Sequence, residues 1–445
     1  MERADIVVIG GGPGGLAAAA GARAAGAGRV LVLERAPRTG GILNQCIHDG
    51  FGLVRYKKML TGPEYAKRAR AEAARAGVEV RTGAMVTDLS PDRVVTAVTR
   101  SGLLEVQAGA VVLATGCRER TRGALGIPGD RPAGGYTAGA AQDLINVRDL
   151  MIGRRVVVLG SGDIGLIMAR RLTLEGAQVL GVAELRRAPG ALERNVQQCL
   201  YDFGIPLWLG TTVTEIRGRG RVEGVVLAQV GPDGRPRPGT ARTVPCDTLL
   251  LSVGLIPENE VSARAGAAVD AATNGLETDD RLRTTLPGIF ACGNCRRVMD
   301  LADFVTVQGE AAGANAARWL RGEALVPLPP ETSHAMAKGL PQPGVCTCIC
   351  CPKGCRIAVA ADGTTQGNAC PKGETYARQE QRAPQRVLTT TVKDGAGRLV
   401  PVKTERPIAR AELLRCARAA RGLTWPDGAA RLADPFGLGV DLIAP

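Results

Sequence analysis

Two glycine-rich turns of one design constrain the fold more than any other feature. The segment ADIVVIGGGPGGLAAAAGARAAG holds Gly10, Gly12 and Gly15 at G-x-G-x-x-G spacing, after an apolar strand and before an Ala-rich helix. The first glycine permits a tight turn, the second lets backbone approach a pyrophosphate, and the third lets helix and strand pack closely. The following strand, RVLVLE, ends in Glu34, whose carboxylate can accept hydrogen bonds from ribose hydroxyls. The segment predicts a βαβ unit that binds a dinucleotide.

The same pattern returns later in GRRVVVLGSGDIGLIMARRLTLEGAQVLGVAE. Its fingerprint consists of Gly160, Gly162 and Gly165. Glu184 ends the next strand, and the interval from the first glycine to the acid is the same in both segments. Two complete signatures predict two dinucleotide sites. Glu184 favours NAD because its charge would repel a 2′-phosphate, whereas Arg186 and Arg187 can bind that phosphate, so NADP stays open.

Further apolar strands complete the pattern. GAVVLATGCRER contains Thr115-Gly116, TLLLSVGLIPEN has the same character, and LPGIFACGN leads to Gly293-Asn294 before a helix-like segment. These four motifs together resemble the two-dinucleotide-binding flavoproteins that include the pyridine-nucleotide disulfide reductases. In that family the first fingerprint holds FAD, the second holds NAD(P), and a late strand returns to the FAD domain. The resemblance covers residues 4–322.

The resemblance implies an α/β fold with two Rossmann-like domains, in which the NAD domain interrupts the FAD domain, followed by a small Cys-rich α+β domain. The expected boundaries are 1–120 and 250–322 for the FAD-binding domain, 121–249 for the NAD(P)-binding domain with its connecting segment, 323–345 for a Pro-rich linker and 346–445 for a Cys-rich iron–sulfur domain. The FAD-binding residues it implies are Gly10, Gly12, Gly15, Glu34, Gly41, Thr115, Gly116, Gly293 and Asn294. The NAD-binding residues it implies are Gly160, Gly162, Gly165 and Glu184.

The sequence departs from the disulfide reductases in two ways. Their C-x4-C redox pair would begin at Cys46, but the matching second position is Phe51, so disulfide reductase chemistry is not expected. Their late Gly-Asp, which meets FAD, is here Gly293-Asn294, and Asn can still hydrogen-bond. His48 lies where the chain can pass the flavin, which leaves both a proton-transfer role and a structural role open.

A cysteine-rich stretch, CTCICCPKGC, follows the Pro-rich segment, and GNACPKG comes later. Together they give C-x2-C-x3-C-x14-C, formed by Cys348, Cys351, Cys355 and Cys370. Three thiolates on one loop and a fourth from a later turn favour a 4Fe–4S cluster, because structural zinc sites more often use two separated knuckles. Zinc, a 2Fe–2S cluster and no metal remain open, and either of the surplus thiols, Cys346 or Cys350, can replace a ligand. The pattern is similar to the 4Fe–4S segment of molybdopterin oxidoreductases.

The remaining cysteines and the charge suggest no other site. The spacing of Cys292 and Cys295 allows a redox pair, but Cys292 ends an apolar strand, which is typical of a buried structural thiol. Cys117, Cys199, Cys246 and Cys416 are isolated, and we expect them to be structural. The net charge is +13, but Arg residues alternate with acids, so we expect no specific nucleic-acid binding. The chain enters a strand directly after Met1, which predicts a cytoplasmic protein.

Several stretches carry a closer resemblance. GGILNQCIHDGFG, TGPEYA and IPGDRPAGGYTAGAAQDLIN resemble the flavoprotein encoded beside glycerol-3-phosphate dehydrogenases and a subunit of hydrogen cyanide synthase, opine oxidase and amino-acid dehydrogenase complexes. The Cys-rich region resembles a small domain found as a separate protein beside such enzymes. The resemblance implies an FAD-dependent oxidoreductase, the electron-transfer subunit of a hetero-oligomeric dehydrogenase, with membrane contact only through a partner.

Such a chain can move electrons between FAD, the cluster and NAD(H) or a partner flavoenzyme that oxidises a small metabolite, because a flavin exchanges electrons both in pairs and singly. No catalytic acid or base is assigned. One alternative is a stand-alone NAD(P)H:acceptor reductase with a structural zinc. Another is a zinc-containing flavin-binding regulatory module, which would bind nucleic acid in a salt-dependent way.

Overall fold

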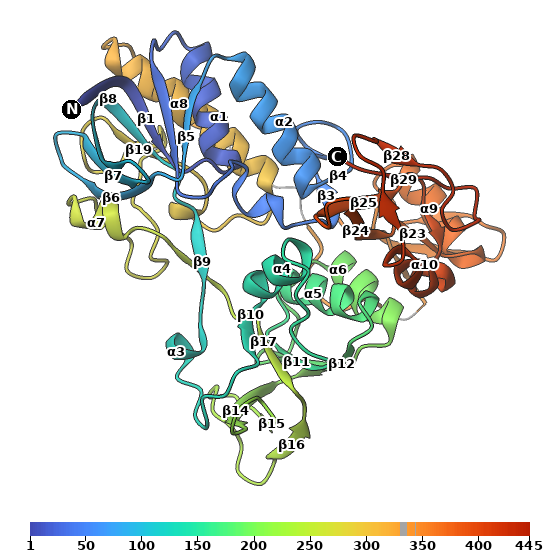
Figure 1. Ribbon diagram of the computed structural model, residues 1–445. Helices are drawn as coiled ribbons and strands as arrows, with labels where there is room; N and C mark the ends of the chain where they lie inside the picture. Colours follow the sequence, from blue (N-terminus) through green and yellow to red (C-terminus); the bar gives the residue numbers. More distant parts are fainter. Residues whose placement is uncertain (330–335, 343) are drawn as a thin grey trace. The chain divides into compact units, whose positions relative to one another are not determined.

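The computed structural model describes residues 1–329, 336–342 and 344–445 (Figure 1). The expected Pro-rich linker, 323–345, therefore lies partly outside the described residues. The chain forms two compact units: Met1–Arg118 with Leu255–Thr332, and Glu119–Gly254 with Ser333–Pro445. Each unit is described by itself below, and the expected domain boundaries stay predictions.

The first unit is built on a parallel sheet with the order β5-β2-β1-β8, in which β19 pairs with the other side of β8. Apolar runs such as VVI and VLVL form its central strands because both of their faces are buried. The strands are β1 (Glu2–Ile9), β2 (Val30–Glu34), β5 (Glu79–Thr82), β8 (Gly102–Leu113) and β19 (Ile289–Ala291).

Helices cover one face of this sheet and an antiparallel hairpin covers the other. Helices α1 (Pro13–Ala24) and α8 (Ala302–Leu320) lie side by side (Figure 1). They approach so closely that a Cβ on Gly313 would lie 1.8 Å from the carbonyl oxygen of Ala18. Strands β6 (Met85–Leu89) and β7 (Val94–Thr99) pack their apolar side chains on the opposite face. Because both faces of the sheet are covered, a ligand is expected to bind beyond the carboxyl ends of its parallel strands.

The second unit repeats the architecture with the parallel strand order β10-β17-β11-β12-β13. These strands are β10 (Gly135–Thr137), β17 (Thr248–Leu251), β11 (Arg155–Leu159), β12 (Gln178–Glu184) and β13 (Leu207–Leu209). One face is covered by α4 (Ala138–Asn146), α5 (Asp163–Leu174) and α6 (Glu193–Cys199), which lie together above the sheet in Figure 1. The other face packs against the antiparallel strands β14 (Thr211–Arg217), β15 (Gly224–Gln229) and β16 (Arg242–Pro245).

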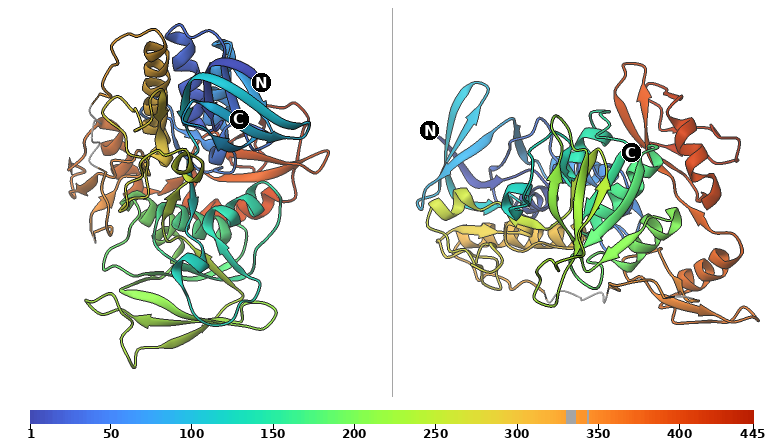
Figure 2. Two further views of the ribbon diagram at one scale, coloured as in Figure 1. Left: turned by 90° about the vertical axis from the view of Figure 1, so that its left-hand side faces the viewer. Right: turned by 90° about the horizontal axis from the view of Figure 1, so that it is seen from below.

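The C-terminal segment packs into this second unit. Its elements are β20 (Cys346–Thr347), β21 (Arg356–Val359), β22 (Thr365–Gln366), α9 (Pro371–Arg382), β24 (Thr389–Asp394), β25 (Leu399–Thr404), α10 (Leu413–Ala420), β27 (Thr424–Trp425), β28 (Arg431–Leu432) and β29 (Leu442–Ile443). Leu174 of α5 belongs to the same apolar core as α10, and Arg171 donates to the hydroxyl of Thr390 at 3.0 Å. The segment is coloured orange to red in Figure 2, where its hairpins and short helices can be followed from two directions.

Shorter elements connect these parts. They are η1 (Gly41–Asn44), β3 (Asp49–Phe51), β4 (Leu60–Thr61), α2 (Gly62–Arg75), β9 (Cys117–Glu119), α3 (Arg122–Leu125), η2 (Tyr201–Phe203), β18 (Leu255–Pro257), α7 (Glu260–Arg264), η3 (Gly293–Cys295), β23 (Gln385–Arg386), β26 (Ile408–Ala409) and η4 (Arg410–Glu412). Helix α2 begins with a capping box, in which Thr61 and Glu64 bond each other's backbone amides. In the described ranges, none of the helices combines the length and the apolar character needed to cross a bilayer.

Candidate functional site

The first glycine turn connects β1 to α1, and its backbone explains each glycine. Gly10 has φ +107, and a Cβ there would lie 2.4 Å from the carbonyl oxygen of Ala114. A Cβ on Gly15 would lie 1.8 Å from the carbonyl oxygen of Gly10. Gly12 differs, because a Cβ there would meet no heavy atom within 4 Å. The turn thus leaves open space in front of the N-terminus of α1, where backbone N–H groups attract a phosphate.

Glu34 is positioned by this turn at the end of β2. Its Oε2 accepts from the amide of Gly11 at 2.7 Å, and its Oε1 accepts from the amide of Ala36 at 2.7 Å. A carboxylate has about four acceptor sites, so two remain for ribose hydroxyls. The buried acid therefore both stabilises the turn and keeps capacity to bind a nucleotide.

Gly41 and the Thr115-Gly116 pair also lie in the first unit. A Cβ on Gly41 would lie 3.1 Å from the Cα of Gly12, so the structure brings Gly41 to the glycine turn. The hydroxyl of Thr115 donates to the carbonyl of Glu258 at 2.7 Å, and the carbonyl of Gly116 accepts from the amide of Glu258 at 3.0 Å. These bonds fix the chain that leaves β8, next to Ala114, the residue that faces Gly10.

The late Gly293-Asn294 pair reaches the same region. Cys292, at the end of β19, has its Sγ 3.6 Å from the position of a Cβ on Gly14, which is in the first turn of α1. The Asn294 side chain accepts from the amide of Met299 at 3.0 Å and donates to Cys117 Sγ at 3.4 Å. The amide of Gly293 donates to Gln308 on α8 at 3.1 Å, a partner that sequence reasoning missed. Asn294 thus orders its own loop, as a hydrogen-bonding residue at this place should.

The second glycine turn, between β11 and α5, has the same geometry. Gly160 has φ +95, and a Cβ there would lie 2.0 Å from the carbonyl oxygen of Ser252. A Cβ on Gly165 would lie 2.6 Å from the Ser252 Cβ, and one on Gly162 would lie 3.3 Å from the Ser252 hydroxyl. Ser252 therefore fills the place against which the helix start packs, and Gly162 has less open space than Gly12.

Glu184 differs from Glu34 in how many donors it already holds. Its Oε2 accepts from the amide of Ser161 at 2.9 Å and from the Ser161 hydroxyl at 2.5 Å. Its Oε1 accepts from the amide of Arg186 at 3.0 Å and from Arg186 Nε at 3.1 Å. Burial tends to raise the pKa of the Glu184 carboxyl, but these hydrogen bonds outweigh burial and hold that pKa below its ordinary value. All four acceptor sites of this acid are engaged.

The two arginines that follow Glu184 are exposed. The Arg186 side chain is 66% accessible although its Nε is held by Glu184, and Arg187 is exposed as well. A guanidinium anchored in this way keeps its remaining N–H groups available to an anion. The preference between NAD and NADP accordingly stays a prediction.

The cysteines of the C-terminal segment gather around β20, β21 and the start of α9. The amide of Cys348 donates to the carbonyl of Cys355 at 2.8 Å, which closes the loop between them. Cys370 is the N-cap residue of α9 and is exposed. The buried thiol of Cys348 hydrogen-bonds to Cys350, which raises the pKa of Cys348 and lowers that of Cys350. Cys351 and Cys370 lie close enough to oppose the Cys350 thiolate electrostatically.

Whether these thiols suit a metal centre depends on chemistry and on arrangement. Thiolates are the donors that iron–sulfur clusters and structural zinc use. Within residues 1–329, 336–342 and 344–445, however, no three His, Cys, Asp or Glu side chains are arranged to hold one ion. The donor set fits by its chemistry, and Cys346, Cys350 and Cys355 pack against Cys348, although the described thiols are not arranged around one ion in this structure. The ligands Cys348, Cys351, Cys355 and Cys370 therefore stay predictions.

Four buried thiols outside this segment lack the environment of a redox centre. Burial raises the pKa of both Cys292 and Cys295, and the Cys295 thiol donates to the carbonyls of Cys292 and Leu113. Burial also raises the pKa of Cys46 to about 12 and that of Cys199 to about 12. Reactive cysteines are thiolates in electropositive surroundings, so these residues have the character of core thiols.

The His48 ring packs against the Phe51 ring, and the two ring centroids are 5.0 Å apart.

Two acidic residues of the second nucleotide-binding fold hold the cysteine segment. Glu193, at the start of α6, is fully buried and accepts from the Thr347 hydroxyl and from Arg356 Nε, each at 2.8 Å. Asp202 accepts from Arg386 at 2.5 Å and 3.0 Å. Sequence reasoning missed both acids, because their partners lie more than a hundred residues later in the chain.

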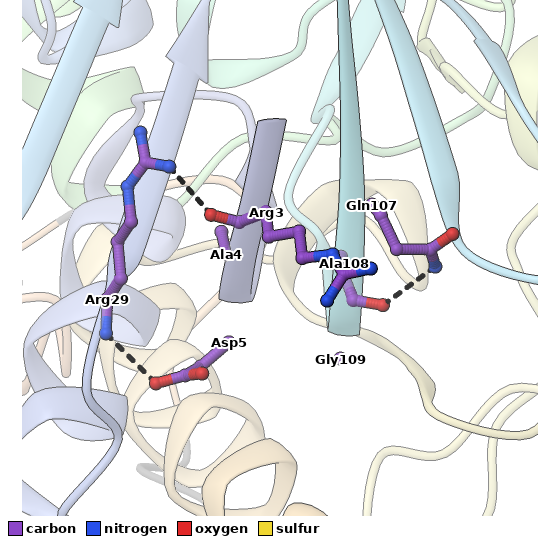
Figure 3. Close-up of a pocket in the computed structure, with 7 residues that line it drawn as sticks. All are labelled: Arg3, Ala4, Asp5, Arg29, Gln107, Ala108 and Gly109. Carbon is purple, nitrogen blue, oxygen red and sulfur yellow. Dashed lines mark hydrogen bonds between the residues drawn. The ribbon is translucent and has the colours of Figure 1, made fainter. Parts of the chain in front are cut away.

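A cavity of about 310 Å³ lies elsewhere in the first unit (Figure 3). Arg3 and Gln107, which pair across β1 and β8, contribute to its wall. The Arg29 side chain donates to the carbonyl of Arg3, and the Arg29 amide donates to Asp5. Because the wall is formed where β1 begins and Gly10 follows where β1 ends, the cavity is not the dinucleotide site.

Comparison with known proteins decides the family. Residues 4–310 match the family described as pyridine nucleotide-disulphide oxidoreductase. The chain belongs to this family. As a member of the pyridine nucleotide-disulphide oxidoreductases, it is an FAD- and NAD(P)-dependent oxidoreductase, and the expected α/β fold with two Rossmann-like domains and a small C-terminal domain is confirmed. Residues 371–445 match a second family, described as a protein of unknown function (DUF1667).

Curated relatives in this oxidoreductase family extend over different shares of the chain. An opine oxidase subunit from Agrobacterium tumefaciens (strain Ach5) is 29% identical over 95% of this chain and 94% of its own length. The thioredoxin reductase of Treponema pallidum is 28% identical over 66% of this chain and 89% of its own length. The benzene 1,2-dioxygenase system ferredoxin–NAD(+) reductase subunit of Pseudomonas putida is 28% identical over 65% of this chain and 66% of its own length.

Solved structures show the same fold. Lactococcus lactis thioredoxin reductase aligns with a TM-score of 0.60 at 24% identity, over 72% of this chain and 99% of its own. The NAD-dependent persulfide reductase of A. fulgidus aligns with a TM-score of 0.56 at 19% identity, over 98% of this chain and 73% of its own. At these identities the likeness supports the fold alone.

Proposed function

We propose that this oxidoreductase is the electron-transfer subunit of a dehydrogenase complex. It moves electrons between FAD, a 4Fe–4S cluster in the C-terminal segment, and NAD(H) or a partner flavoenzyme that oxidises a small metabolite. The single observation that carries the proposal is the pair of bonds from Thr347 and Arg356 to Glu193. These bonds attach the cysteine loop to a helix of the second nucleotide-binding fold, so thiols and a nucleotide fold belong to one compact unit.

The first turn supplies the FAD site. The amides at the start of α1 face the open space at Gly12, which suits a pyrophosphate, and Glu34 keeps acceptor capacity for the ribose. When bound there, FAD supplies exchange of electrons in pairs with a nicotinamide and singly with a metal centre. Asn294 and Gln308 order the loop that returns to this turn.

The second turn supplies the nucleotide site of the other unit. Glu184 fixes the backbone of the turn through Ser161, and Arg186 is held where it can meet the ribose or its phosphate. NAD is the expected cofactor, with NADP as the alternative. Binding at this turn orients a nicotinamide by the pyrophosphate, so this chain needs no acid or base of its own for hydride exchange.

The partner is inferred from the relatives. The match to the opine oxidase chain extends over nearly the whole of both sequences, including the C-terminal segment, and the name of that protein describes one subunit of an enzyme. A ferredoxin–NAD(+) reductase subunit is among the other relatives. Both support a hetero-oligomer in which another subunit oxidises the substrate. We propose that the complex is cytoplasmic and touches a membrane only through a partner.

Cofactor content tests this proposal. Iron, acid-labile sulfide, zinc and flavin are measured per chain on protein purified anaerobically. About four irons and four sulfides with one flavin are expected for the proposed relay. One zinc without iron would remove the cluster from the proposal.

A stand-alone NAD(P)H:acceptor reductase is the second candidate. It is favoured by one observation, namely that Lactococcus lactis thioredoxin reductase aligns over 99% of its own length with 72% of this chain. The fold with two nucleotide turns is therefore complete without a cysteine segment of this kind. Such an enzyme would reduce artificial acceptors with NAD(P)H without any partner and would contain no iron. Steady-state assays on the isolated chain, together with the metal analysis, separate it from the first proposal.

A further inference from the structure

Three adjacent antiparallel strands of the first unit, β6, β7 and β8, expose a line of apolar side chains. Met85 on β6 pairs with Val98 on β7, and Val98 pairs with Leu103 on β8. Paired residues project from the same face of a sheet, so these three form one apolar row across the strands labelled in Figure 1. Their exposed fractions are 46%, 46% and 76%. Single exposed apolar residues are ordinary, whereas a contiguous group of them is typical of a contact surface.

The next row along the same strands carries negative charge. Asp88 pairs with Thr96, and Thr96 pairs with Glu105, so two carboxylates lie on either side of one hydroxyl. Both acids are exposed. The alternate residues of β7, Val95 and Ala97, are fully buried, so the apolar row and this acidic row lie on the face that points away from the core.

A basic side chain lies beyond the other end of the apolar row. Arg100 is exposed in the short turn from β7 to β8, two residues after Val98, whereas Thr96 comes two residues before Val98. In the described part of the chain, Arg100, Asp88 and Glu105 take part in no ion pair. The face therefore has acids on one side of the apolar row and a base on the other, and their charges are not compensated within the chain.

This distribution of charge is complementary to itself. A two-fold axis along the apolar row, in the plane between two copies, lays one apolar row on the other and turns the acidic side of each copy toward the basic side of the other. Arg100 of one copy then faces Thr96 of the other, between Asp88 and Glu105. Sheets packed face to face lie about 10 Å apart, a distance that an arginine and a carboxylate side chain span together. An axis along the strands would instead oppose acid to acid, so the charges select one arrangement.

We propose that this face of β6, β7 and β8 joins two copies of the chain in an isologous dimer. The apolar rows form the centre of the contact, and Arg100 meets the acidic row at its rim. Leu103 lies near the start of β8, whereas Ala114, which faces Gly10, follows the end of that strand, so the contact leaves the first glycine turn accessible. The proposal does not depend on the metal content or on the electron-transfer role proposed above.

Sedimentation velocity of the full-length protein over about 1–100 µM tests the dimer. We expect the dimer to form as the concentration rises. Leu103→Ser should raise its dissociation constant at least about tenfold, because the contact loses one apolar side chain from each copy. Leu150→Ser is the matched control, because it removes an exposed apolar side chain from the other unit and should change nothing. Flavin content reports on folding in every variant.

Charge reversal tests the two-fold arrangement. Arg100→Glu places a carboxylate opposite Asp88 and Glu105 and should abolish the dimer in the same range of concentration. Combining it with Glu105→Arg reverses both charges of the contact and should restore the dimer. Arg382→Glu, at an exposed position on α9, is the control for the change in net charge and should leave the dimer intact.

Each other outcome overturns the proposal. Unchanged protein that stays monomeric over the whole range excludes the dimer. If such monomeric protein also loses a copurifying subunit on Leu103→Ser, the face belongs to that subunit instead. A dimer that survives both Leu103→Ser and Arg100→Glu uses another surface. A dimer that Arg100→Glu breaks and Glu105→Arg does not restore lacks the proposed two-fold arrangement.

Discussion

The hydroxyl of Ser161 donates to the carboxylate of Glu184 at 2.5 Å, within the turn that the second fingerprint forms. The equivalent residue of the first fingerprint is Gly11, which has only its amide to offer Glu34. The two turns share one backbone design, but their acids differ in how many hydrogen-bond acceptor sites remain unoccupied. Glu34 retains unoccupied acceptor sites and those of Glu184 are filled, so we expect the two turns to bind a ribose differently.

Ser161→Gly is expected to strengthen NAD binding at the second site. Removing the hydroxyl returns one acceptor site of Glu184 to the ribose, as at the first site, and one hydrogen bond contributes about 0.5–1.5 kcal/mol. The dissociation constant for NADH, measured by fluorescence titration, should fall about 2- to 10-fold. Ser101→Gly, at an exposed turn, is the control and should change nothing. An unchanged constant for Ser161→Gly would show that Glu184 does not contact the ribose.

The lowered pKa of Glu184 predicts a pH-dependent contribution to stability. Since the folded pKa lies below the unfolded value of about 4.3, the carboxylate stabilises the fold fully above that value and loses this effect as the pH falls through the folded pKa. The free energy of unfolding of Glu184→Gln should therefore lie furthest below that of the unchanged protein at about pH 7. The gap should narrow below about pH 4.3. Urea unfolding at several pH values measures this difference in the free energy of unfolding. A difference that does not change with pH would contradict the lowered pKa of Glu184.

Gly12→Ala separates nucleotide binding from folding. A Cβ at Gly12 meets no heavy atom within 4 Å, and its φ of −72° suits any residue, so the variant should fold. The methyl group would occupy the space expected for the pyrophosphate, at a cost of about 1–3 kcal/mol. FAD affinity should fall about 5- to 150-fold in apoprotein reconstitution. Gly15→Ala should instead lose soluble protein, because its Cβ would lie 1.8 Å from the Gly10 carbonyl oxygen.

How far the sequence predicts this site differs between its parts. The glycine turns were predictable because their residues are local: Gly10, Gly15 and the strand before them specify one backbone path. Glu34 and Glu184 were found because a βαβ unit has a fixed length. Contacts such as Thr347 to Glu193 were not predictable, since they join segments far apart in the chain and have no local pattern. The engagement of the Glu184 acceptor sites depends on side-chain rotamers, which spacing does not reveal.

Cys348→Ser tests the metal centre directly. An alcohol is a poor ligand for iron at neutral pH, so a variant of a true ligand should lose most of its iron and sulfide while flavin stays at the level of the unchanged protein. Colorimetric iron and sulfide assays with flavin absorbance measure this. Cys117→Ser is the control: Cys117 lies in the other compact unit, and a serine there can still accept from Asn294, so this variant should keep both cofactors. Equal iron in the two variants would exclude Cys348 as a ligand, and the test extends to Cys350, which pairs with it.

Asp202→Asn is expected to loosen the C-terminal segment. The Asp202 side chain is fully buried, and Arg386, which it binds at 2.5 Å, is 2% exposed. Removing the Asp202 charge leaves the buried Arg386 guanidinium with Glu380 as its remaining carboxylate, so the cost should be less than the value of about 3–5 kcal/mol for leaving a buried charge unpaired.

The variant should lose its C-terminal segment faster in limited proteolysis and should melt at a lower temperature. Asp149→Asn is the control, because its pair with Lys393 is about half exposed and such pairs contribute about 1 kcal/mol or less. Asp149 has φ +56, which Asn also adopts readily, so the control adds no backbone strain. Equal proteolysis of the two variants would show that the apolar core around Leu174 and α10, rather than the buried ion pair, holds the cysteine segment to the nucleotide-binding fold.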